Sequence, residues 1–141
     1  MLGNQLFLAR KYSQATENLE LALEKDPQNL AIKHKLVICY TQIGQIDKAL
    51  SIFISILRKN VDFIINTDPL DDDCPCPELV LELEKKLCEN RDSLDYQLIM
   101  GMLWLYCSIE KSLQYFLKAQ QIMPQNQEVN SILKILNNYK V

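Results

Sequence analysis

The sequence predicts an all-α fold of stacked helix–turn–helix units, and two observations support this prediction. The first is an internal repeat: Ala15 and Ala49 lie 34 residues apart, and the same spacing separates Leu2 from Leu36, Tyr12 from Ile46, Leu19 from Phe53, Ala22 from Ile56 and Leu23 from Leu57. A fixed period of this size is typical of stacked pairs of helices. The second is composition, because three glycines and five prolines in 141 residues indicate long regular elements joined by short turns.

Apolar residues at helical spacing predict four helices in the first part of the chain. We expect them over residues 2 to about 11, 12–25, 30–43 and from 46 onward. In each, apolar residues recur at every third or fourth position, as a buried helical stripe requires. The turn Asp26–Asn29 contains a proline, which ends the second helix. Gly44 supplies the left-handed residue that closes the third.

The regular pattern ends after Asn60. Apolar residues between 61 and 65 predict that the fourth helix continues, and a short extended segment is the alternative. The stretch Asp68–Pro77 contains three prolines and four aspartates, which exclude both a helix and a central strand, so we expect a surface loop. Further helices are predicted over 78–88, 93–107, 109–122 and 126–139.

These elements predict a single domain over 1–141. Its expected parts are a first repeat with an incomplete first helix (1–29), a second repeat (30–66), an acidic Pro/Cys loop (67–77), an inserted helix (78–91), a degenerate third repeat (92–124) and a capping helix (125–141). A repeat array needs such a last helix to cover its terminal apolar face. The incomplete first helix indicates either a longer natural chain or a short helix that frays.

Matching positions of the first two units carry a family resemblance. They are Leu2, Gly3, Leu6, Tyr12, Ala15, Leu19, Ala22, Leu23, Asp26 and Pro27, and then Leu36, Tyr40, Gly44, Ala49, Phe53 and Leu57. This pattern resembles the tetratricopeptide repeat (TPR) family over about residues 2–60. It departs from the family at Val37, Ile56 and Val61. The resemblance implies a right-handed superhelix whose small residues, such as Gly3 and Ala15, mark close helix crossings.

The resemblance also implies a site, because the first helix of each pair lines a concave groove in this family. The residues that its geometry nominates for peptide or partner binding are Asn4, Phe7, Leu8, His34, Lys35, Ile38, Thr41, Gln42, Trp104 and Leu105. Apolar helical stripes are usually buried, so Phe7, Ile38 and Trp104 are equally well explained as core. Clamping of a chaperone C-terminal carboxylate is not expected, since Lys35 stands where that subgroup has asparagine.

Composition excludes several classes of partner. A net charge of −3 and a pI near 5.2 provide no basic surface for a phosphate backbone, so nucleic acid is not expected. No run of apolar residues is long enough to span a membrane. The N-terminal residues do not have the pattern of a signal peptide. An odd number of cysteines, five, then predicts free thiols in a reducing cytoplasm.

Catalysis and metal binding find little support. His34 is the one histidine, and we expect it to be exposed or to line the groove rather than to act as an acid or base. Glutamate pairs such as Glu17/Glu20 and Glu82/Glu84 are interpreted as solvated helix faces. Cys74 and Cys76 flank one proline, which is not a usual zinc spacing, so they are weak candidates for a metal or redox site. No cofactor is expected.

The sequence therefore predicts a non-catalytic scaffold or adaptor that binds a peptide or a partner helix in the groove. The alternative is a self-associating assembly module, a homo-oligomer, or a chaperone-like assembly factor, because an incomplete first unit leaves an apolar edge. A metal or redox module at Cys74–Cys76 is the lesser alternative.

Overall fold

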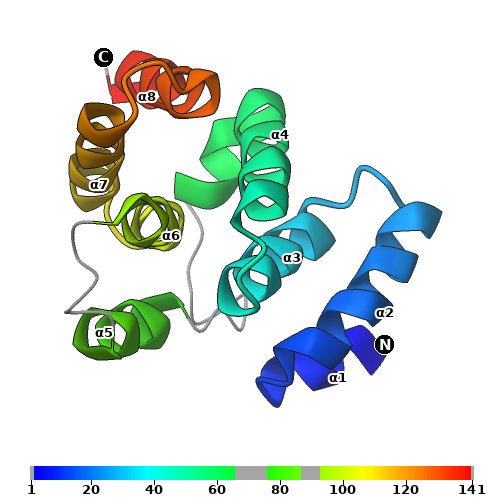
Figure 1. Ribbon diagram of the computed structural model, residues 1–141. Helices are drawn as coiled ribbons and strands as arrows, with labels where there is room; N and C mark the ends of the chain where they lie inside the picture. Colours follow the sequence, from blue (N-terminus) through cyan, green and yellow to red (C-terminus); the bar gives the residue numbers. More distant parts are fainter. Residues whose placement is uncertain (1, 66–75, 87–92, 141) are drawn as a thin grey trace. The chain divides into compact units, whose positions relative to one another are not determined.

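The structure, a computed structural model, describes residues 2–65, 76–86 and 93–140. Within these ranges it contains eight helices and no strand, which confirms the all-α prediction. The helices are α1 (Leu2–Leu8), α2 (Tyr12–Lys25), α3 (Leu30–Gln42), α4 (Ile46–Ile65), α5 (Cys76–Lys86), α6 (Leu94–Trp104), α7 (Ile109–Ile122) and α8 (Gln127–Lys140) (Figure 1).

The chain divides into two compact units, Met1–Ile56 and Leu57–Val141. The first contains α1, α2, α3 and the beginning of α4, and the second contains the end of α4 followed by α5 to α8. In the first unit α2 packs against both α1 and α3, whereas in the second α6 and α7 form the most extensive helix pair. The superhelical path of the repeats stays a prediction.

The turn between α2 and α3 stops one helix and starts the next, as the sequence predicted. The Asp26 N–H donates to the carbonyls of Ala22 and Leu23 at 3.1 and 3.2 Å, which closes α2. Asn29 is the N-cap of α3, because its Oδ1 accepts from the Ile32 N–H at 3.1 Å. Side-chain capping of this kind satisfies a backbone donor that the first turn of a helix leaves open.

Left-handed residues end α1 and α3 in the same way. Gly44 has φ +82°, and the next N–H, of Gln45, donates back to the Tyr40 carbonyl at 2.9 Å. Arg10 lies one repeat earlier, 34 residues before Gly44, and has φ +60°. The Lys11 N–H correspondingly donates to the Leu6 carbonyl at 2.9 Å. The repeat thus keeps its turn geometry even where the residue is not glycine.

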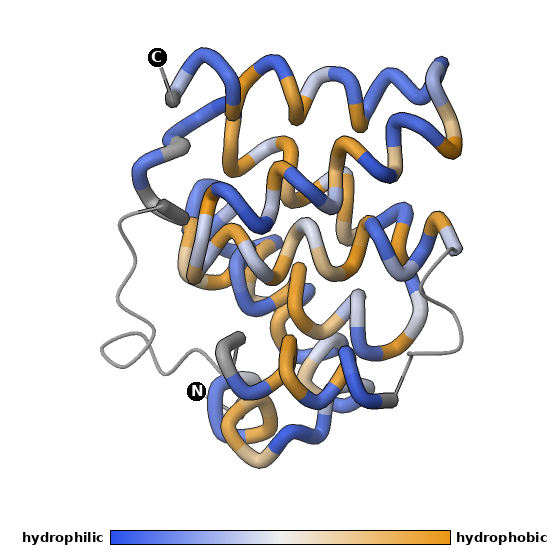
Figure 2. Tube along the Cα trace, turned by 90° about the vertical axis from the view of Figure 1, so that its left-hand side faces the viewer, coloured by the Kyte–Doolittle hydropathy of each residue, from blue (hydrophilic) through white to orange (hydrophobic). Residues whose placement is uncertain are grey.

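Small residues allow α1 and α2 to cross closely. A Cβ added at Gly3 would lie 3.2 Å from the Leu19 side chain, and both Ala15 and Leu19 are fully buried. Figure 2 shows that hydrophobic segments recur along each helix and alternate with polar ones. The core of this unit continues through Leu36, Ala49 and Phe53, none of which is exposed.

The second unit contains a comparable crossing between α6 and α7. A Cβ on Gly101 would lie 2.9 Å from the Phe116 ring, so only glycine fits there without a shift. Next to it the buried Ser112 hydroxyl donates to the Gly101 carbonyl at 2.6 Å. Helix α8 packs on α7 through one apolar side that carries Val129, Ile132, Leu133 and Leu136. That α8 acts as a cap remains a prediction.

Several predicted boundaries differ from those observed. Helix α4 does reach Ile65, as predicted, but Asn60 interrupts it with extended backbone (φ −159°, ψ 90°). Helix α5 begins at Cys76, two residues early, because a proline at 77 is compatible with a first helical turn. Helix α6 ends at Trp104 rather than 107, because the following residues form a turn in which the Cys107 N–H donates to the Trp104 carbonyl. The rest of the predicted loop, 67–75, lies outside the described residues, as do 87–91.

The left-handed turn at Arg10 leads to a stability prediction. A positive φ costs a residue with a Cβ about 1–2 kcal/mol, and glycine removes that cost. We expect Arg10→Gly to raise the free energy of unfolding by about 0.5–1 kcal/mol, the gain being reduced by the lost contacts of the arginine. Urea unfolding of the two proteins measures the difference.

Gly44→Ala is the matched control, because a Cβ there meets nothing within 4 Å and only the backbone conformation is penalised. It should lower the free energy of unfolding by about 1 kcal/mol. If Arg10→Gly instead lowered stability as much as Gly44→Ala does, the turn at residue 10 would not carry backbone strain.

Candidate functional site

The first helices of the two repeats are joined by a polar contact between two of the nominated residues. Lys35 on α3 donates from its Nζ to Asn4 Oδ1 on α1 at 2.8 Å. The same ammonium lies 5.8 Å from the centroid of the Phe7 ring, within the range of a cation–π contact. Asn4 and Lys35 are both partly exposed. The structure therefore brings Asn4, Phe7 and Lys35 together. The sequence pattern did not predict this contact, because Asn4 and Lys35 are 31 residues apart.

Four nominated residues of the first unit are enclosed by protein. Phe7 is 2% exposed, Ile38 0%, Thr41 5% and His34 4%. Such side chains cannot touch a bound peptide without a conformational change, so the alternative interpretation of Phe7 and Ile38 as core applies to this structure. Our expectation that His34 is exposed or lines a groove is wrong. Burial depends on contacts with helices distant in sequence, which a helical pattern alone does not reveal.

The buried His34 is held in its neutral form. Burial, and after it the positive charge of Lys35, lower the pKa of His34 from 6.5 to about 3. An imidazole with such a low pKa binds no proton near neutral pH and is a weak general base. His34, the one histidine of the sequence, is therefore a buried structural residue.

The remaining nominated residues of α1 and α3 lie nearer the surface. Leu8 is 57% exposed, as much as Leu21 and Leu81. Gln42 is partly exposed, and its Nε2 donates to the Thr41 hydroxyl at 3.3 Å, which in turn donates to the Ile38 carbonyl at 2.7 Å. These hydrogen bonds orient the Gln42 amide, so its oxygen is presented as an acceptor.

Trp104 and Leu105 belong to the second unit. Leu105 is buried, whereas Trp104 is partly exposed and carries the Lys111 ammonium 4.1 Å from its ring centroid. Tyr115 of α7 is close by, since Trp104 lowers its pKa slightly. That pKa is nevertheless raised to about 12, chiefly by burial and then by Tyr96 and Glu84. Trp104 thus combines an aromatic surface with a cation, whereas Leu105 belongs to the core.

The cysteine candidates for metal binding are not described. Cys74 lies outside the described residues, and for Cys76 the structure describes the backbone at the start of α5 but not the side chain. Among the side chains that are described, no group of three or more His, Cys, Asp or Glu could hold a metal ion. The two described cysteines, Cys39 and Cys107, are free thiols, and burial raises the pKa of Cys39 to about 11.

Comparison with known protein families gives a match over part of the chain. The family model of the tetratricopeptide repeat matches residues 6–64, from within α1 to near the end of α4. Over this segment the chain is similar to the tetratricopeptide repeat. The resemblance drawn from the 34-residue period is thereby confirmed for the first two helical pairs. No curated protein and no solved structure matches the chain at a significant level.

The matched repeat has a general role in the proteins that contain it. Tetratricopeptide repeats generally mediate protein–protein interaction and are typically non-catalytic.

A separate observation concerns membranes: across residues 2–65, 76–86 and 93–140, no helix combines the length and the apolar character needed to cross one.

The depressed pKa of His34 predicts a specific dependence of stability on pH. Because the folded pKa is about 3 and the unfolded value about 6.5, the unfolded chain binds the extra proton between these limits. Stability should be complete above pH 6.5 and fall as the pH drops towards 3, by up to about 1.4 kcal/mol per pH unit from this residue.

The test compares unfolding free energies of wild type and His34→Gln at pH 7.5 and pH 5. Carboxylates contribute to the pH dependence of both proteins, so the difference between them isolates His34. We expect the variant to lose less stability on acidification. Equal losses in the two proteins would show that His34 is accessible to protons in the folded state.

Proposed function

We propose that the chain is a non-catalytic adaptor whose repeats bind a peptide or helix of a partner protein along α1 and α3. The observation that carries this proposal is the contact between Lys35 and Asn4, which places one cation between the first helices of consecutive repeats. First helices are the side on which this family usually receives its ligands. A neutral His34, which is a weak general base, favours binding over catalysis.

The chemistry of this surface suits a partner with both polar and apolar groups. The Lys35 ammonium has three N–H donors, and the Asn4 carbonyl accepts one of them. The others can donate to a backbone carbonyl or a carboxylate of the partner. Leu8 supplies exposed apolar area on α1, and Gln42 adds an oriented amide on α3. We call Asn4, Leu8, Lys35 and Gln42 the first-helix surface.

The buried residues nominated from the sequence take a supporting role in this proposal. The Phe7 ring lies under the Lys35 ammonium, and the Thr41 hydroxyl holds the Gln42 amide. Both contacts reduce the freedom of the surface side chains before a partner arrives, which lowers the entropy lost on binding. The free, buried thiol of Cys39 is compatible with the reducing cytoplasm that we propose as the setting.

The proposal predicts that Lys35→Ala combined with Leu8→Ala weakens partner binding at least about tenfold, since a charged and an apolar contact are lost together. Because both side chains reach the surface, thermal stability should change little. Affinity capture from a native extract, identification of the retained protein and calorimetry with that protein measure the effect.

Lys134→Ala is the control, because Lys134 is an exposed lysine on α8. Ile38→Ala is not a suitable probe, since truncating a fully buried isoleucine costs about 2–5 kcal/mol and weakens the fold itself. Undiminished affinity of the Lys35/Leu8 double variant for the captured protein would remove the first-helix surface from the proposal.

A further inference from the structure

A second surface of the first unit lies on the other helices of its repeats. Two adjoining hollows share Tyr40 of α3. The first, of about 270 Å³, is lined by Glu20, Leu23, Glu24, Pro27, Leu36 and Tyr40. The second continues across Tyr40 to α4, where Lys48, Ser51 and Ile52 line it. We call the two together the α2–α4 groove, with α2 and α4 as its walls and α3 as its floor.

The floor of the α2–α4 groove is apolar and held in place. Leu36 is fully buried and lies beneath the surface of the groove, whereas Tyr40 is 5% exposed and presents a small area to it. The Tyr40 hydroxyl hydrogen-bonds Glu20, and the Lys48 ammonium lies 5.8 Å from the centroid of its ring. Burial, followed by the charge and hydrogen bond of Glu20, raises the pKa of Tyr40 to about 12, so the hydroxyl remains protonated.

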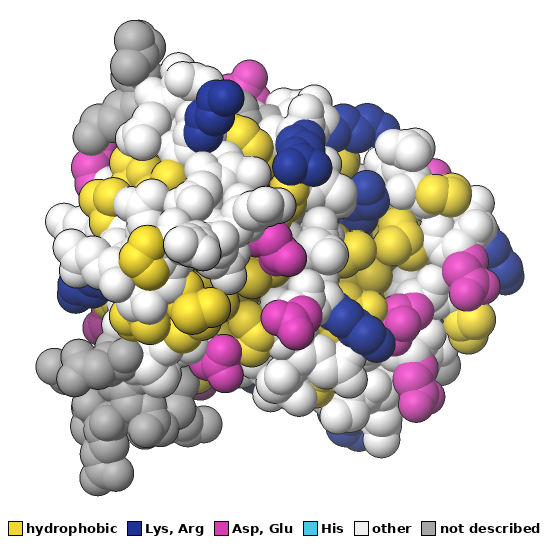
Figure 3. All heavy atoms as spheres, turned by 45° about the horizontal axis from the view of Figure 1, so that its top comes forward, with side chains coloured by type: hydrophobic (Ala, Val, Ile, Leu, Met, Phe, Trp, Pro, Cys, Tyr) yellow, Lys and Arg dark blue, Asp and Glu magenta, His cyan; other side chains and the backbone are white. Residues whose placement is uncertain are grey.

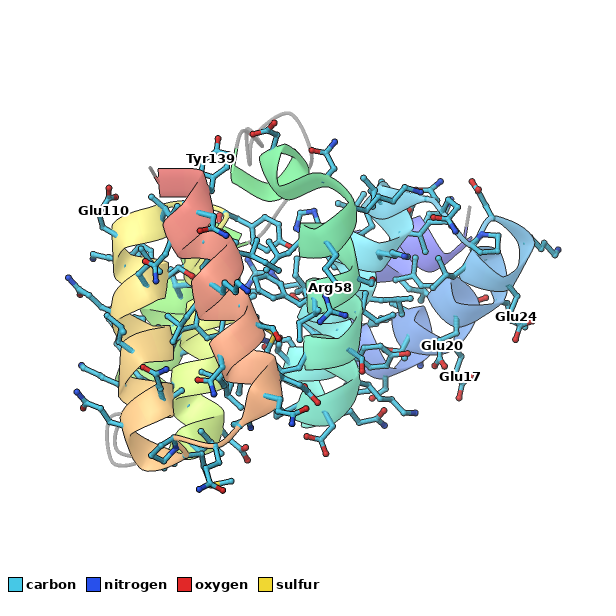
Figure 4. The ribbon with its side chains drawn as sticks, turned by 90° about the horizontal axis from the view of Figure 1, so that it is seen from above. Glu17, Glu20, Glu24, Arg58, Glu110 and Tyr139 are labelled. Carbon is cyan, nitrogen blue, oxygen red and sulfur yellow. The ribbon has the colours of Figure 1, made fainter. Side chains whose placement is uncertain are left out.

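The α2 wall is acidic. Glu17, Glu20 and Glu24 are all exposed, and Figure 4 shows them projecting from the same side of α2. On the opposite wall the charges of Asp47 and Lys48 offset one another. Figure 3 shows a hollow on its right-hand side, where hydrophobic side chains form the bottom and both acidic and basic side chains border it. The groove therefore offers apolar contact beside net negative charge.

We infer that the α2–α4 groove binds a basic amphipathic helix of a partner protein, with lysine or arginine side chains on the three glutamates and an apolar row over Leu23, Pro27 and Tyr40. Opposite charge is what the acidic wall selects. Ion pairs at a water-exposed wall contribute little to the binding free energy. Apolar contact with the floor supplies the rest. An acidic helix in the same place would set like charges against each other.

The spacing of the glutamates favours a helix over an extended peptide. Residues 17, 20 and 24 are three and four positions apart, so the stripe rises about 10 Å along α2. A helix lying alongside repeats the same steps with side chains at i, i+3 and i+7. In a strand, three side chains on one face span about 13–14 Å, which exceeds the length of the stripe.

This inference does not depend on the proposed function, since the two surfaces use different side chains, even where both include residues of α3. The first-helix surface is weakly basic and uses α1 and α3, whereas the α2–α4 groove is acidic along α2. Partners of opposite charge are therefore expected at the two surfaces, and one chain can connect them. The helical pattern predicted a solvated face for Glu17 and Glu20. A further signal in the sequence is the acidic i, i+3, i+7 pattern of residues 17, 20 and 24, which is followed by Pro27.

The test uses the whole chain and a fluorescein-labelled, alanine-based helical peptide with lysines at i, i+3 and i+7 and a row of leucines beside them. Fluorescence anisotropy at physiological salt should show saturable binding. Glu20→Gln combined with Glu24→Gln should raise the Kd about five- to tenfold, because two charge contacts are lost. Lys48→Gln should lower the Kd about two- to threefold, because a repelling charge is removed.

Matched controls separate the groove from general attraction between charges. Glu110→Gln with Glu128→Gln removes two exposed carboxylates of the second unit, and Lys111→Gln removes an exposed lysine there. These variants should leave the Kd unchanged, as should the Lys35/Leu8 double variant, which tests the proposed function alone. A second probe with glutamate in place of lysine should not bind.

Three results would overturn the inference. They are absence of binding to the wild-type chain, an equal loss of binding in the Glu110/Glu128 control, and equal binding of the acidic probe. Circular dichroism of each variant establishes that its helix content is retained. The Glu20/Glu24 substitutions change exposed side chains only, so we expect the fold to be retained. Any loss of helix would appear in the circular dichroism spectrum.

Discussion

The close approach of paired helices at small residues is the constraint on which the rest of the structure depends. Gly3 faces Leu19 in the first unit, and Gly101 faces Phe116 in the second, each with no room for a larger residue unless its neighbour shifts. At the second crossing the Ser112 hydroxyl also donates a buried hydrogen bond to the Gly101 carbonyl. Because the backbones approach so closely, large side chains elsewhere on the same helices can fill the core at high density.

That geometry separates the surfaces on which a partner can bind. In the first unit, α1 and α3 carry one lysine held by an asparagine, with an exposed leucine nearby. Helices α2 and α4 instead border a groove with an acidic wall. The two helical pairs of the first unit therefore present two surfaces of different charge, and such surfaces select different partners.

Polar groups inside the first unit are matched to their surroundings. His34 is neutral because it is buried beside Lys35, and the Cys39 and Tyr40 pKa values are raised by burial, so none of the three is charged at neutral pH. An ionised group at any of these positions would lose its hydration without compensation. Helix α3 can therefore be buried along much of its length while its sequence contains several polar residues.

The sequence by itself determined the helices and the repeat. The limits of α2 and α7 agree with prediction because local signals set them: a 3.6-residue apolar period within each, and a proline shortly after each ends, Pro27 and Pro124. The left-handed turn at Gly44 was also predictable from a local signal, because glycine adopts a positive φ without steric cost. Such features depend on neighbours within a few residues.

Only the tertiary structure decided which side chains reach the surface and which meet. Ile38 and Lys35 lie on one helix, yet Ile38 is buried and Lys35 meets Asn4 on α1. Glu20 reaches Tyr40 in the next repeat in the same way. These contacts join residues 20 or more positions apart, and their geometry depends on how whole helices pack. A helical pattern identifies an apolar side but not its neighbours, which is why the fold was predictable and much of the site was not.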